Sequence, residues 1–105
     1  MREPARSVEI TDHDQSDYLE FLNFKKNSLK ELLSYILLQK DQYEYNETNY
    51  RLFMADYEEV CLKYDIMCKE ILRTYAPDFL GSMDHEMTFD FEKKKLIIYK
   101  KEGDN

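Results

Sequence analysis

Between Pro4 and Pro77 the sequence contains neither proline nor glycine. Proline breaks helices, glycine weakens them, and both residues supply the turns on which sandwiches and barrels depend. With only two of each in 105 residues, the chain is poorly suited to an all-β fold. Hydrophobic residues make up 43% of it and aromatic residues 14%, more than a disordered chain carries. The sequence therefore predicts long helices in a folded protein.

Two helices are expected, one over residues 14–44 and one over 47–75, joined by a polar turn. Asp12, Asp14 and Ser16 are good caps for the first helix. The second helix has apolar residues spaced alternately four and three apart over almost four heptads, which is the pattern of a helix that packs along its length. We expect this seam to mediate self-association into a dimeric four-helix arrangement. Its residues are Tyr50, Met54, Tyr57, Cys61, Tyr64, Cys68 and Ile71.

The C-terminal part of the chain changes from helical to β character. Pro77 ends the second helix, because the residue before a proline is pushed out of helical space. Alternating apolar residues then predict a two-stranded hairpin over residues 86–100. A turn at Glu92–Lys95 would place Phe91 opposite Leu96 and Phe89 opposite Ile98. One face would carry Met87, Phe89, Phe91, Leu96 and Ile98, and the other Ile97 and Tyr99.

These elements predict an α+β protein: a long antiparallel helical hairpin followed by a C-terminal two-stranded β-hairpin. Residues 13–101 are expected to form a single domain. Residues 1–12 would be a flexible N-terminal arm that contains a possible short strand at Ser7–Ile10. Residues 102–105 would be a frayed tail.

The hairpin is the expected partner-binding surface. The strand Leu96–Tyr99 is apolar on both faces, although a strand of an isolated hairpin should expose polar residues on one face. We therefore expect Ile97 and Tyr99, with Lys94 and Lys95 beside them, to contact a partner. Three kinds of cover remain open: a strand added by another protein, sheet pairing within a homodimer, and the N-terminal arm of the same chain.

Charge and composition limit the partner classes. The formal net charge is −7, and the basic run near the C-terminus is too small for a nucleic-acid footprint, so direct nucleic-acid binding is not expected. The N-terminal sequence lacks the apolar region of a signal peptide, and no apolar run approaches the length of a membrane span. We therefore expect a cytoplasmic protein that does not bind membranes.

Two cysteines and two histidines are the candidates for catalysis or metal binding. Cys61 and Cys68 would lie about 10.5 Å apart along a helix, too far for a disulfide, and they lack the close spacing of zinc ligands. His13 and His85 each lie between acidic residues at expected element ends, where solvated side chains are the rule. We therefore predict no catalytic residue, no metal and no cofactor.

The tyrosine-rich helix with Tyr50, Tyr64 and Tyr75, followed by the closing hairpin MTFDFEKKKLIIY, resembles a family of small bacterial accessory proteins. These proteins are encoded beside radical-SAM maturases in peptide systems whose precursors carry repeated Cys-x-x-x units. The resemblance covers roughly residues 46–99 and includes no catalytic motif. The tryptophans of the family pattern are absent here, and the linker at Pro77–Met83 is longer. The resemblance implies an accessory role in peptide modification.

Two functions follow as hypotheses. The first is a non-catalytic accessory module that binds a protein or a peptide, in the setting of ribosomal-peptide modification that the resemblance implies. The alternative is an acidic inhibitor or antitoxin-like protein that blocks a nucleic-acid-binding enzyme, because an acidic body can mimic DNA.

Overall fold

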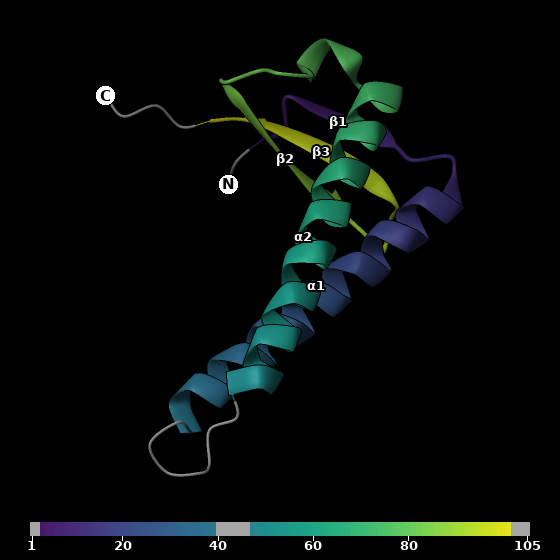
Figure 1. Cartoon of the computed structure of the whole chain (residues 1–105). Helices are drawn as coiled ribbons and strands as arrows, with labels where there is room; N and C mark the ends of the chain where they lie inside the picture. The colour runs from purple at the N-terminus through teal and green to yellow at the C-terminus, as the bar shows by residue number, and fades with distance from the viewer. Residues whose placement is uncertain (1–2, 40–46, 102–105) are drawn as a thin grey trace. The chain divides into compact units, whose positions relative to one another are not determined.

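A computed structural model describes residues 3–39 and 47–101 of the chain and confirms an α+β fold (Figure 1). Helices α1 and α2 form an antiparallel hairpin, a short 3-10 helix η1 follows, and three strands form one antiparallel sheet. The elements are β1 (Arg6–Glu9), α1 (His13–Gln39), α2 (Glu47–Tyr75), η1 (Pro77–Phe79), β2 (His85–Asp90) and β3 (Lys95–Lys100).

The chain divides into two compact units. Unit 1 comprises Met1–Tyr18 and Met67–Asn105, and unit 2 comprises Leu19–Ile66. Unit 1 therefore holds the whole sheet with the beginning of α1 and the end of α2. Unit 2 holds the rest of both helices. It is one continuous segment of sequence, whereas unit 1 combines two segments.

Local sequence signals set the helix ends that the structure describes. The side-chain Oδ1 of Asp12 accepts hydrogen bonds from the backbone N–H groups of Asp14 (3.1 Å) and Gln15 (3.4 Å), which caps the start of α1. Helix α2 covers the range 47–75 expected from the heptad seam. It ends at Tyr75, and Pro77 then begins η1. The expected end of the first helix at residue 44 and the turn before residue 47 lie outside the described residues.

The β2–β3 pairing differs from the predicted register by two residues. Phe89 lies opposite Leu96, and Asp90 opposite Lys95, so the turn is formed by residues 91–94. Two local features favour this turn: Lys93 N donates to the Asp90 carboxylate (3.0 Å), and Lys94 adopts a left-handed φ of 53°. A two-residue shift preserves the faces of the strands, so Leu96 and Ile98 still share one face and Ile97 the other.

The short strand expected as a possibility at Ser7–Ile10, within the segment expected to be a flexible arm, is present as β1 (Arg6–Glu9). Strand β1 pairs antiparallel with β3, with Val8 opposite Leu96, and the sheet order is β1-β3-β2. Of the three kinds of cover left open for the hairpin, the structure shows the N-terminal segment. The physical reason is that Val8 adds an apolar side chain to the Leu96 face, while pairing satisfies the backbone of β3 on both sides. The expected frayed tail at 102–105 lies outside the described residues.

Each unit has its own buried apolar residues. In unit 1, Leu96 and Ile98 from the central strand are 0% and 1% exposed. They are joined in that unit by Ile10, Cys68, Ile71 and Ala76. In unit 2, Leu19, Leu22, Leu33 and Val60 are buried. The side chain of Lys26 on α1 places its Nζ 3.9 Å from the ring centroid of Tyr64 on α2, which is a cation–π contact between the helices.

Two substitutions in unit 1 should have opposite effects on stability. Ser16 is 1% exposed and its hydroxyl has no hydrogen-bond partner among the described residues, so Ser16→Ala removes an unsatisfied buried group. We expect it to leave the free energy of unfolding unchanged or raise it by up to about 1 kcal/mol. Leu96→Ala should lower it by about 2–5 kcal/mol. Urea denaturation monitored by circular dichroism measures both, and a loss above about 1 kcal/mol for Ser16→Ala would contradict the burial argument.

Candidate functional site

A cleft of about 240 Å³ opens on unit 1 between the end of α2, the turn after η1 and strand β2. Its lining is mainly apolar, and Lys69, His85 and Glu86 add charged or titratable groups. The remaining lining residues are Leu72, Phe79, Leu80, Gly81, Ser82, Met87 and Ile98.

The turn after η1 is shaped by residues with special backbone roles. Pro77 stands at the first position of η1, where its missing N–H costs nothing. Gly81 has a φ of +79°, a conformation that other residues adopt only with strain. Ser82 Oγ then lies 2.9 Å from His85 Nδ1 and accepts a hydrogen bond from Asp84 N (3.3 Å). These bonds fix one wall of the cleft to the beginning of β2.

The aromatic ring of Phe79 is held from two sides. It meets the His85 ring edge to face, with centroids 4.8 Å apart, and the Arg6 guanidinium carbon lies 4.6 Å from its centroid. Arg6 also donates to the Asp78 carboxylate at 2.7 Å. That hydrogen bond lowers the pKa of Asp78 below its ordinary value of 3.8. Strand β1, which carries Arg6, thereby contributes to the support of the cleft wall.

The cleft lies beside an outer strand of the sheet. Lys101 N donates to Asp84 O at 2.7 Å, so these two residues form a hydrogen-bonded pair. Every second residue of β2 from there on is likewise hydrogen-bonded to β3. By that alternation the backbone groups of His85, Met87 and Phe89 point away from β3. Strand β2 is at the end of the sheet order, and no other described strand pairs with this side of it. His85 and Met87 also line the cleft, so an apolar hollow and a strand edge coincide.

The predicted partner residues Ile97 and Tyr99 lie on a different surface. Both are half-buried on the central strand β3, on the face opposite Leu96 and Ile98. Ile97 has Thr88 on one side and Ser7 on the other. Because β3 is paired along both edges, it cannot accept an added strand. Contact of Ile97 and Tyr99 with a partner through their side chains stays a prediction.

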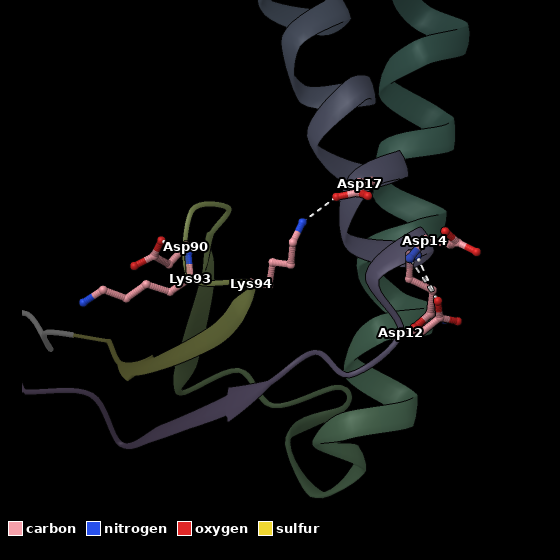
Figure 2. Close-up of polar contacts among 7 residues, drawn as sticks. Asp12, Asp14, Asp17, Asp90, Lys93 and Lys94 are labelled. Atoms are coloured by element: carbon pink, nitrogen blue, oxygen red, sulfur yellow. Dashed lines mark hydrogen bonds and ion pairs between the residues drawn. The ribbon is translucent and has the colours of Figure 1, made fainter.

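The two predicted lysines divide between the turn and the sheet. Figure 2 shows Lys94 reaching from the β2–β3 turn to Asp17 on α1, and its Nζ lies 2.5 Å from the carboxylate. This lysine is therefore engaged within unit 1. Lys95 is half-buried at the beginning of β3, opposite Asp90 and Glu9. The structure does not bring the four predicted partner residues together with the cleft.

The heptad seam of α2 is a packing face within the chain. Cys68 and Ile71 are 6% and 0% exposed in unit 1, and Val60 in unit 2 is 4% exposed. The seam residues Tyr50, Met54, Tyr57, Cys61 and Tyr64 are half-buried in unit 2. A side-chain hydrogen bond with Cys61 raises the pKa of Tyr57. One side of α2 therefore packs within the chain, and the predicted self-association through the seam stays a prediction.

The cleft itself was missed at the level of sequence. Its residues come from two separate stretches of the chain, and only the pairing of β2 with β3 brings Ile98 to the same place as Leu72. The sequence signal that points to it is Gly81-Ser82, a pair that favours a turn, between the apolar Leu80 and Met83.

No family model matches this chain, and no curated protein or solved structure does so either. Among the described residues, no group of three or more His, Cys, Asp or Glu side chains is arranged to hold a metal ion. No helix in the described part of the chain is long and apolar enough to cross a membrane.

The Arg6–Asp78 pair makes a pH prediction. Because the pKa of Asp78 is lowered in the folded state, its contribution to stability is present above about pH 3.8 and is lost as the pH falls through the folded value. We expect the melting temperature of the native protein to exceed that of Asp78→Asn near neutral pH. The difference should shrink toward zero as the pH approaches 2. Both side chains are partly exposed, so the difference is small. A difference that does not change with pH would contradict this assignment.

Proposed function

We propose that this chain is a non-catalytic module that binds an extended segment of another polypeptide. The segment pairs with the outer edge of β2 and inserts an apolar side chain into the cleft. The observation that carries the proposal is the coincidence of the two features: His85 and Met87 line the cleft and also present backbone groups along the strand edge. Strand addition gives affinity through the main chain, and a pocket beside the edge gives specificity for side chains.

The size of the cleft favours a side chain over a free small molecule. Pockets for drug-sized ligands and cofactors have volumes of about 300–1,000 Å³, and this cleft has about 240 Å³. It is therefore large enough for one bulky side chain and small for a cofactor. Leu80 at the turn is 42% exposed, so an incoming apolar group finds an apolar neighbour that is still accessible to solvent.

The resemblance to accessory proteins of peptide-modification systems supports the same class of partner. In those systems the modified substrate is a peptide, and an accessory protein that holds it in extended form would need a strand edge and a side-chain pocket. A peptide partner also fits the structure, because a single extended strand can follow β2 without displacing any element of unit 1.

Binding is testable with peptides selected from a random 12-residue display library and measured by fluorescence anisotropy. Leu80→Glu places a charge at the cleft and should weaken binding of the selected peptides at least tenfold. Met83→Glu is the matched control, because Met83 is 83% exposed in the same turn and is not part of the cleft lining. It should bind the peptides like the native protein.

Strand addition also predicts that binding of the same peptides requires their backbone amides. Alternate amides of the bound peptide face β2, and N-methylation of these amides should abolish binding because it removes their hydrogen-bond donors. N-methylation of the intervening amides, which face away from β2, should have little effect. The double variant Ile97→Thr, Tyr99→Thr should retain binding. If this variant loses binding while Leu80→Glu retains it, the peptide binds the opposite face of the sheet and the proposal is wrong.

A further inference from the structure

Helix α1 carries a second apolar surface in unit 2, separate from its buried side. Leu22 and Leu33 are buried on one side of the helix. On another side, helical periodicity aligns a row of large apolar residues that we call the outer stripe. Its members and their exposed fractions are Phe21 (56%), Phe24 (71%), Leu32 (37%), Tyr35 (60%) and Leu38 (76%).

The exposed area of the outer stripe is of the size that a protein interface needs. An aromatic side chain carries about 150–250 Å², so the three aromatic residues alone leave roughly 400 Å² in contact with water. Monomeric proteins rarely expose contiguous apolar patches above a few hundred Å². Together with Leu32 and Leu38, two such stripes buried against each other approach the lower range of specific interfaces, about 1,200 Å² in total.

The outward side of α2 in unit 2 differs from the outer stripe. Its exposed apolar residues Leu52, Leu62 and Ile66 are interrupted by Glu59 and Lys63, which form an ion pair at 3.0 Å. The hydrogen bond from Lys63 lowers the pKa of Glu59, so this carboxylate is charged at neutral pH. An exposed ion pair is typical of a solvated helix face. The outer stripe, by contrast, is interrupted by Ser28 and Glu31.

The outer stripe is complementary to itself when two copies of α1 run antiparallel. Phe21, Phe24, Tyr35 and Leu38 occupy the a and d positions of a heptad, and Leu32 lies beside them at an e position. Antiparallel helices pair an a position with a d position. Phe24 then lies level with Tyr35 of the second copy, and Phe21 with Leu38. The small, polar Ser28 lies level with Glu31, where it can donate a hydrogen bond to the carboxylate. On the flank of the stripe, Lys25 of one copy lies within about one helical turn of the Glu31 carboxylate of the other copy.

A parallel arrangement would be unfavourable for an electrostatic reason. It places each residue opposite itself, so Glu31 would meet Glu31 of the second copy in the centre of the interface. Two carboxylates buried side by side destabilise an interface unless one of them is protonated. Charge complementarity therefore selects the antiparallel pair.

We propose that two copies of this chain associate through the outer stripe of α1, with the two helices antiparallel. The partner is a second copy because the stripe supplies both halves of the complementary pattern. This inference concerns unit 2 and uses none of the residues of the cleft, so it stands or falls independently of the proposed function.

Sedimentation velocity over the micromolar range tests the association. The native protein should be dimeric, and the double variant Phe24→Glu, Tyr35→Glu should raise the dissociation constant at least about 100-fold. The control is Leu52→Glu, Leu62→Glu on α2, which makes the same charge change at residues of similar exposure. It should remain dimeric. Circular dichroism checks that both variants keep the native helix content, as expected for exposed positions.

Three results would overturn the proposal. One is a native protein that remains monomeric at the highest concentration. Another is a dimer that survives the α1 substitutions but dissociates with the α2 substitutions. The third concerns direction: a spin label at Glu20→Cys, in a background with Cys61→Ser and Cys68→Ala, should give an intermolecular distance of about 30 Å in the antiparallel pair. A distance below about 15 Å would show parallel helices.

Discussion

The end of α2 at Tyr75 is the constraint on which unit 1 depends. Pro77 prevents the helix from continuing, and η1 reverses the chain so that β2 can pair with β3. The Tyr75 hydroxyl reinforces this point: it accepts a hydrogen bond from Asp12 N (3.0 Å) and lies 3.2 Å from Gln15 Oε1. The last residue of α2 is thus tied to the first turn of α1. A helix that ended one turn later would carry the cleft residue Phe79 into a helical position, and the cleft would not form as it does here.

Elements with strong local signals were predictable from sequence, and pairings between distant segments were only partly so. The heptad spacing and Pro77 fixed the bounds of α2, and alternation of apolar residues identified the strands of the hairpin. The register required the left-handed φ of Lys94 and the Asp90 side-chain bond, which several lysines in a row do not reveal. The pairing of β1 with β3 joins residues about ninety positions apart, so only the apolar Val8 and Ile10 indicated it.

The heptad seam shows what periodicity can and cannot specify. It correctly indicates that one side of α2 packs along its length. It does not say whether the partner helix belongs to the same chain, because the same apolar side chains can pack against a helix of this chain or of a second copy. In this chain the antiparallel hairpin brings α1 within reach of α2, and Lys26 of α1 contacts the seam residue Tyr64. The site was missed for a related reason: a cleft depends on where a helix end, a turn and two strands meet, and none of them signals the cleft alone.

The two proposed binding surfaces offer different groups to a partner, and these groups decide the class of partner for each. The cleft is concave, holds about one side chain and lies beside backbone donors and acceptors, so it suits an extended strand. The outer stripe of α1 lies on a single helix and offers only side chains, because the backbone of a helix is already hydrogen-bonded. It therefore suits another helix with a similar ridge of side chains. Since the cleft belongs to unit 1 and the outer stripe to unit 2, a peptide and a second copy of the chain do not compete for the same residues.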